Sequence, residues 1–77
     1  MCLGFPGLIE SLNLHEATVD VAGTKRQIST IFLGDTVKEG DWVMVHAGFA
    51  MSKMDEQEAK ETLEFLLDYT DESKHSF

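Results

Sequence analysis

The sequence lacks several features that would mark out other classes of protein. It contains one cysteine among 77 residues, so no disulfide can form within the chain, and small secreted domains usually depend on such bonds. One proline and six glycines are too few for a collagen-like or low-complexity chain. Because 43% of the residues are hydrophobic, the sequence predicts a folded globule stabilised by the packing of its core.

Positive charge and long hydrophobic runs are also scarce. Six Lys and Arg residues stand against 14 Asp and Glu, which gives a formal net charge of -8 at pH 7. Such a negative field repels phosphate groups, so we expect neither nucleic acid nor a membrane as a partner. No apolar run approaches the roughly 20 residues that cross a bilayer, and the opening residues lack the parts of a secretion signal. We therefore predict a cytoplasmic protein that binds other proteins.

The length of the chain suits a single domain in three consecutive parts. A chain this short buries only about 60% of its unfolded surface, which leaves little room for a deep enzyme cleft. The apolar pattern is that of strands at first and becomes helical near residue 55. The sequence predicts a β-barrel over residues 1–54, a helix over residues 55–69 and a flexible tail over residues 70–77.

Short β-branched runs separated by turn residues indicate a small antiparallel sheet in the first part. The predicted strands cover residues 8–14, 17–21, 27–33 and 42–46, with a hairpin turn at Gly23. A curled sheet of four or five short strands fits this pattern best. Closure into a barrel would remove the exposed strand edges that promote aggregation.

Residues 55–69 have the spacing of an amphipathic helix. Asp55 and Glu58 have the spacing of a capping box, with Asp in place of Ser or Thr. The apolar residues that follow fall on one face: Ala59, Leu63, Leu66 and Leu67. A helix of about 15 residues is marginal alone in water. This apolar face must therefore dock on the barrel or on a partner.

Cys2 has the most informative chemistry in the chain. The thiolate is the reactive form of cysteine and a soft ligand that suits iron, copper or zinc. Removal of Met1 would add an α-amine to the same residue and create a potential bidentate chelate. A lone cysteine can also be an inert small hydrophobe, but a residue beside a chain terminus is rarely part of the core. We interpret Cys2 as a functional thiol.

The residues after Cys2 form a compact motif, Gly4-Phe5-Pro6-Gly7. Glycines on both sides of a proline allow close backbone approach and limit the number of chain conformations. The motif predicts a turn that could aim Cys2 in a defined direction. An ordinary loop before a strand has the same composition and is the alternative.

His46 is the second candidate for a functional site. In a strand over residues 42–46 it shares a face with Trp42 and Met44, so it is not forced into the aliphatic core. Its imidazole could bind metal or hold a partner's side chain, and a structural hydrogen bond is the alternative. With Cys2 it lacks a third ligand nearby in the sequence. We expect an incomplete donor set that handles metal transiently, and not a closed zinc site.

Three segments of the chain together resemble one known family. The opening Met-Cys-Leu-Gly-Phe-Pro-Gly resembles the amino-terminal motif of the HypC/HupF/HybG family of NiFe hydrogenase maturation chaperones. Residues 40–50, GDWVMVHAGFA, resemble a second block of that family, and residues 55–67 resemble its terminal helix. The similarity spans nearly the whole chain. Phe5 departs from the β-branched aliphatic residue that members commonly carry, which puts partner preference in question more than function.

The resemblance implies a mainly β fold, an OB-like antiparallel β-barrel with a C-terminal α-helix. It implies binding to the scaffold protein HypD and to the precursor of the hydrogenase large subunit. The implied cargo is iron, as a transient Fe(CN)2CO fragment, with Cys2 and His46 as the metal-site residues. Partner contact is implied for the amino-terminal motif and the histidine: Cys2, Leu3, Gly4, Phe5, Pro6 and His46. No catalytic residue is implied, so we do not expect an enzyme.

Two other classes of function remain open at this point. The first is a generic acidic OB-like interaction module without a metal role. The second is an enzyme with Cys2 as an amino-terminal nucleophile and His46 as its base. The enzyme would also need an oxyanion site and a pocket, for which so small a chain offers little room.

Overall fold

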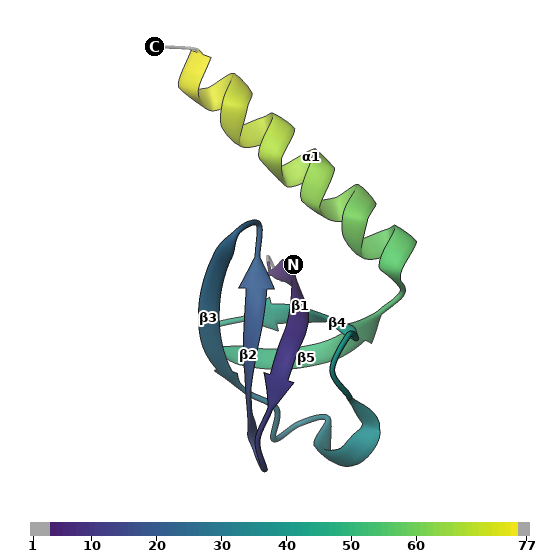
Figure 1. Ribbon diagram of the computed structural model, residues 1–77. Coiled ribbons are helices and arrows are strands. Elements are labelled where there is room, and N and C mark those ends of the chain that lie inside the picture. The colour runs from purple at the N-terminus through teal and green to yellow at the C-terminus, as the bar shows by residue number, and fades with distance from the viewer. Residues whose placement is uncertain (1–3, 76–77) are drawn as a thin grey trace.

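The computed structural model describes the backbone of residues 4–75 and the side chains of residues 4–66. Five strands form a closed barrel, and one long helix follows it (Figure 1). The elements are β1 (Phe5–Leu12), β2 (Glu16–Val21), β3 (Thr24–Ser29), the 3-10 turn η1 (Gly34–Thr36), β4 (Trp42–His46), β5 (Phe49–Met54) and α1 (Glu56–His75). The predicted mainly β fold with a C-terminal helix is confirmed.

The strands follow the order β1-β2-β3-β5-β4, and β4 closes the barrel by pairing with β1. All neighbours are antiparallel except β3 and β5, which run parallel where Ser29 lies opposite Phe49. This is the arrangement of a five-stranded OB-type barrel. Buried aliphatic side chains from every strand, together with Val37 after η1, fill its interior: Ile9, Ala17, Val19, Ile28, Val37, Val43 and Ala50.

Two tight hairpin turns carry the chain from β2 to β3 and from β4 to β5. Each turn is an Ala-Gly pair with positive φ at both residues, 51° and 91° at Ala22 and Gly23, and 54° and 86° at Ala47 and Gly48. This geometry matches the right-handed twist of the flanking strands. The turn at Gly23 is confirmed. The strand after the second turn, β5, was not predicted individually, because its buried residue is the small Ala50 while Phe49 and Met51 are exposed.

The predicted strand over residues 27–33 ends early in the structure. β3 stops at Ser29, and the buried Thr30 donates its backbone N–H to the carbonyl of His15 at 2.9 Å. Leu33 and Gly34 then donate back to the carbonyl of Thr30 at 3.0 Å each. These turn hydrogen bonds replace the sheet pairing that the β-branched composition had suggested.

The helix begins as predicted but ends later. Glu58 donates its N–H to Oδ2 of Asp55 at 3.4 Å, the contact expected at a helix start. The backbone is helical to His75, beyond the predicted end at residue 69, because residues 70–75 contain no Gly or Pro to end a helix. Within residues 4–75, no helix combines the length and apolar character that crossing a bilayer requires.

The first half of α1 docks on the barrel. Ala59 is fully buried, Leu63 and Leu66 are half-buried, and the helix contacts β1 and, less extensively, β4. Figure 1 shows α1 passing over the end of the barrel where β1 begins, with its carboxyl end pointing away. The apolar face of the helix thus covers the barrel itself. The predicted Leu67 side chain lies outside the described residues.

Asp41 ties the turn before β4 to the barrel. Its carboxylate accepts the backbone N–H of Lys38 at 3.0 Å and the Lys38 Nζ at 3.1 Å, while the Lys53 Nζ lies 3.4 Å away. The backbone of this turn also exchanges hydrogen bonds with Ile9 through Gly40 N–H and the Asp41 carbonyl. Partial burial raises the pKa of Asp41, but the bonds from the two lysines outweigh it and hold that pKa below its ordinary value.

Because α1 docks on the barrel, truncation of Leu63 should destabilise the fold. Because this side chain is half-buried, Leu63→Ala should lower the free energy of unfolding by about 1 to 2 kcal/mol, measured by urea denaturation. Phe65→Ala is the matched control on the same helix, since Phe65 is 69% exposed and its loss should change stability little. Equal effects of the two variants would contradict docking through Leu63.

The depressed pKa of Asp41 predicts a pH-dependent loss of stability. The carboxylate stabilises the fold above the ordinary Asp pKa of about 3.9, and this contribution disappears as the pH falls through the lower pKa of the folded state. Asp41→Asn should therefore cost about 1 kcal/mol at pH 7 and much less at pH 2. Urea denaturation at both pH values checks this, with the exposed Asp35→Asn as control. If Asp41→Asn remained equally destabilised at pH 2, the loss of stability would come from packing and not from the charge of Asp41.

Candidate functional site

Strand pairing brings the amino-terminal motif beside the end of β4. Phe5 lies opposite Val45 and Pro6 opposite Met44, so the start of β1 lies beside the last residues of β4, which ends at His46. Segments far apart in the sequence therefore meet where β1 pairs with β4, and Figure 1 shows the start of β1 lying below α1. Cys2 and Leu3 precede this pairing and lie outside the described residues.

Gly4 fits against β4 because it has no side chain. A Cβ at Gly4 would lie 2.5 Å from the Val45 carbonyl oxygen and 2.7 Å from the Met44 Sδ, both inside van der Waals contact. The thioether of Met44 therefore covers the backbone of Gly4. Close backbone approach in the amino-terminal motif, predicted from its glycines, is found at this residue.

The motif itself is strand and not the predicted turn. β1 begins at Phe5, and Pro6 and Gly7 both pair with β4. Proline is tolerated in the first residues of a strand, and here β2 joins the other side of β1 only from Leu8 onward. The predicted isolated turn fails because pairing with β4, a long-range interaction, extends these residues.

Alternation along β1 gives Phe5 and Pro6 different roles. The ring of Pro6 is fully buried, whereas the side chain of Phe5 is 51% exposed. Pro6 therefore belongs to the barrel wall, and the predicted direct contact between Pro6 and a partner does not fit its burial. Phe5 has the surface that such a contact needs.

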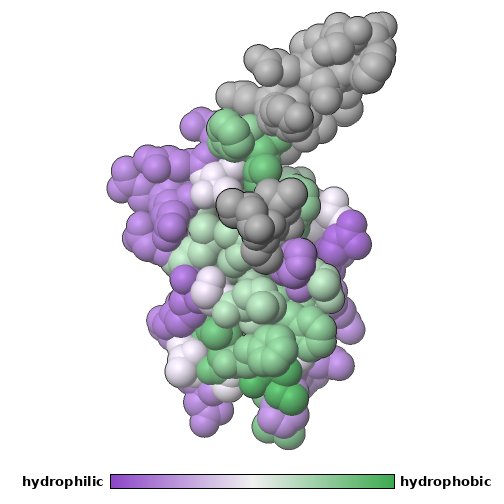
Figure 2. Space-filling view, turned by 180° about the vertical axis from the view of Figure 1, so that it is seen from behind, coloured by the Kyte–Doolittle hydropathy of each residue, from purple (hydrophilic) through white to green (hydrophobic). Residues whose placement is uncertain are grey.

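His46 lies at the exposed end of β4, as its predicted position on the face opposite the core required. Its pairing partner on β5 is Phe49. The ring of Phe49 packs on that of Phe32, with the ring centroids 5.1 Å apart. Ile31, which precedes Phe32, and Met51, two residues after Phe49 in β5, are exposed as well. We call these four residues the aromatic patch: Ile31, Phe32, Phe49 and Met51. Figure 2, seen from the side of β4 and β5, shows hydrophobic side chains gathered over the barrel with hydrophilic margins.

A groove opens between α1 and the tip of the β2–β3 hairpin. Its volume is about 260 Å³, and we call it the apical groove. Phe5 contributes one wall, Leu63 and Leu66 another, and Val21 and Arg26 line it from the hairpin. The groove thus combines apolar walls with one guanidinium, and Phe5 connects it to the amino-terminal motif.

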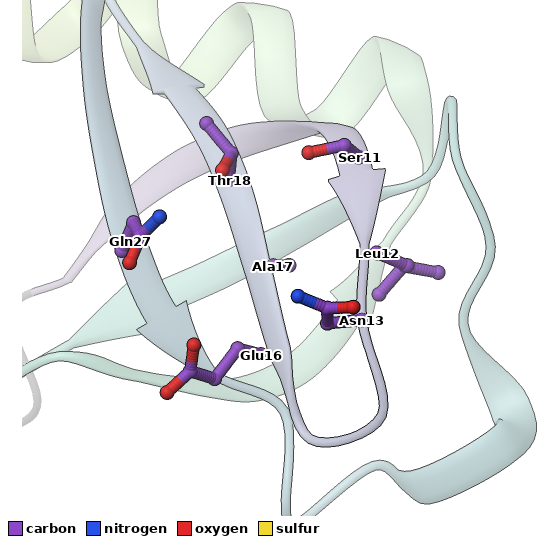
Figure 3. A pocket seen from close by; sticks show the side chains of 7 residues that line it. All are labelled: Ser11, Leu12, Asn13, Glu16, Ala17, Thr18 and Gln27. Atoms are coloured by element: carbon purple, nitrogen blue, oxygen red, sulfur yellow. The ribbon is translucent and has the colours of Figure 1, made fainter.

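A second hollow of about 250 Å³ lies toward the opposite end of β1. Figure 3 shows its side chains arising from β1, β2, β3 and the loop between the first two strands. Its polar groups are hydroxyls, amides and one carboxylate, from Ser11, Asn13, Thr18, Gln27 and Glu16. This hollow is separated from the amino-terminal motif by the length of β1.

Residues that could hold a metal are few in the described part of the chain. Among the side chains of residues 4–66, no three His, Cys, Asp or Glu groups lie together as a metal site would require. His46 is the predicted metal-site residue within that range, and Cys2 falls outside it.

Several residues of this end of the barrel had no assigned role from the sequence. Met44 was placed only on the same strand face as His46, and in the structure its thioether covers Gly4. Phe32 lies in the turn after β3 and Phe49 is the first residue of β5, and the parallel contact of β3 with β5 brings the two rings together. Nothing in the sequence indicated a binding role for Arg26, because its place beside α1 depends on how the helix docks.

Comparison with known proteins supports the family resemblance seen in the sequence. The sequence profile of the HupF/HypC family matches residues 1–66. The chain is 41% identical over 71 residues to hydrogenase maturation factor HypC of Escherichia coli strain K12, covering 86% of this chain and 79% of that protein. It is 42% identical over 77 residues to hydrogenase maturation factor HybG of the same strain, covering 90% and 94%. HypC of Helicobacter hepaticus is 42% identical over 64 residues, covering 82% and 74%. The chain therefore belongs to the HupF/HypC family.

Proposed function

We propose that this chain is a NiFe hydrogenase maturation chaperone that binds HypD and the large-subunit precursor. In this proposal it helps to assemble the Fe(CN)2CO fragment and delivers it through the thiol of Cys2. The observation that supports the proposal is the pairing of β1 with β4, which puts Phe5 opposite Val45, the residue before His46. The chain contributes orientation and shielding to its cargo, and no catalytic turnover is assigned to it.

The thiol of Cys2 has the chemistry that this cargo needs. Cyanide and carbon monoxide favour low-spin iron(II), and a thiolate is a soft ligand that can hold it. A free cysteine titrates at about 8.5, so iron must displace the proton as it binds. Cys2 precedes Phe5 by three residues, and an extended chain spans at most about 3.6 Å per residue, so its Cα stays within about 11 Å of that of Phe5.

His46 is the second residue of the proposed iron site. Its position beside Phe49 puts the imidazole at the same end of β4 that pairs with the amino-terminal motif. A neutral imidazole can bind iron, and a ring N–H can donate to a cyanide ligand. Two donors leave a coordination sphere incomplete, which suits a cargo that must pass to another protein.

The aromatic patch supports a role in protein binding. Phe and Met are enriched at protein interfaces. This patch exposes two Phe residues and Met51, and its Phe49 lies opposite His46. A partner that covers it would also cover the proposed iron site and exclude water. We expect this to take place in the cytoplasm, where free thiols are kept reduced.

Replacement of Cys2 tests the proposed function directly. Cys2→Ala should leave the melting temperature nearly unchanged, because a terminal residue adds little to the core. The complex co-purified with HypD under anaerobic conditions should lose its cyanide and carbonyl infrared bands, and hydrogenase maturation should stop. Ser11→Ala, in the distant polar hollow, is the control and should retain both. Normal maturation by Cys2→Ala would support the generic interaction module, and a large loss of stability would reveal a packing role.

The fit of Gly4 against β4 gives a second test. Gly4→Ala should lower the free energy of unfolding by about 1 to 3 kcal/mol, because the new Cβ meets the Val45 carbonyl. The infrared bands of bound iron should weaken as the amino-terminal segment is displaced. Addition of Met44→Ala should not restore stability, because it removes the sulfur but leaves the backbone oxygen in place. Full rescue by the double variant would mean that the Met44 side chain is the whole obstacle.

A further inference from the structure

Arg26 differs from the described lysines, because no carboxylate of residues 4–66 forms an ion pair with it. Each lysine within residues 4–66 lies within 4.0 Å of a carboxylate oxygen: Lys25, Lys38, Lys53 and Lys60. Arg26 has none, although the chain carries a net charge of -8 and acidic groups are plentiful. A planar guanidinium recognises a carboxylate with two parallel hydrogen bonds, so Arg26 is equipped to receive one from outside the chain.

The apical groove places this guanidinium beside apolar walls. Phe5 is 51% exposed on one side, and the half-buried Leu63 and Leu66 lie on the other. The volume of about 260 Å³ is smaller than the roughly 300 to 1,000 Å³ of pockets for whole small molecules. A groove of this size suits one apolar side chain with a polar group next to it.

We infer that the apical groove binds a peptide segment of a partner protein, with one apolar side chain against Phe5 and Leu63 and one Asp or Glu carboxylate on Arg26. In an extended segment, residues i and i+2 point to the same side, so the recognised pattern is an apolar residue followed two positions later by an acidic one. A polyanion such as nucleic acid is disfavoured by the negative charge of the chain. This inference rests on the proposed function only in that the segment belongs to a maturation partner.

Phe5, which departs from the aliphatic residue that the family resemblance predicts, shapes the groove. Its ring forms a wall of the groove, so replacing an aliphatic side chain by a larger aromatic one changes the shape that the partner's anchor must match. The residue that precedes it along the chain by three positions is Cys2. Phe5, which would contact the peptide, would then be only three residues along the chain from the proposed iron ligand.

A short peptide titrated into the full-length, nitrogen-15-labelled chain tests this inference. The probe is acetyl-Gly-Leu-Ser-Asp-Gly-amide, whose blocked ends leave the Asp side chain as its only carboxylate. We expect the backbone amide signals of Val21, Arg26 and Leu63 to shift. Arg26→Gln, or Asn in place of Asp in the peptide, should weaken binding by about threefold or more, and added salt should weaken binding to the unmodified chain.

Matched controls decide whether the groove is responsible. Lys60→Gln removes the same charge from an exposed helix position outside the groove and should leave binding unchanged. Equal binding of the Asp and Asn peptides, or shifts confined to the aromatic patch, would overturn the inference. A concentration-dependent dimer of the free chain that disappears in Arg26→Gln would also overturn it, because the occupant would then be a second copy.

The same variants separate this inference from the proposed function. If Cys2→Ala stops maturation while Arg26→Gln binds the peptide normally, the groove assignment fails and the iron role stands. If the peptide binds through Arg26 while Cys2→Ala still supports hydrogenase maturation, the proposed iron role of Cys2 is wrong and peptide binding by the apical groove is supported.

Discussion

Pairing of β1 with β4 is the interaction on which the rest of the structure depends. It closes the barrel, and it places Phe5 opposite Val45 at the end where β4 reaches His46. The fit is close enough that Gly4 leaves no room for a Cβ. In the proposed function, stability and iron handling are therefore coupled where β1 pairs with β4, because Cys2 lies three residues before Phe5 in the chain.

The sequence predicts best those features that local chemistry decides. Alternation in residues 17–21 identifies β2, the parity of β4 puts His46 outside the core, and Asp55 marks the start of α1. Ala-Gly at the β2–β3 turn is recognisable because positive φ favours glycine. In each case the neighbours along the chain determine the conformation, so the prediction needs no knowledge of the fold.

The features that the sequence misses depend on residues far away along the chain. The segment Phe5 to Gly7 has the composition of a turn, and only its pairing with β4 makes it a strand. Residues 30–33 have the composition of a strand, but hydrogen bonds to Thr30 and His15 turn the chain. The apical groove requires β1, the hairpin and α1 together. The roles of Cys2 and Leu3 remain predictions, since both lie outside the described residues.

The distribution of charge gives this end of the barrel its selectivity. The described lysines are engaged by carboxylates of the chain itself, so the negative net charge is left to repel other polyanions. Arg26 is the exception among the described Lys and Arg side chains, and it lies where Phe5 and Leu63 offer apolar surface. A ligand with a single carboxylate binds well in this arrangement only if it also brings an apolar group into the groove. Charge and shape must then be satisfied by the same ligand, which is how a small acidic barrel can favour one peptide over the many other anions of the cell.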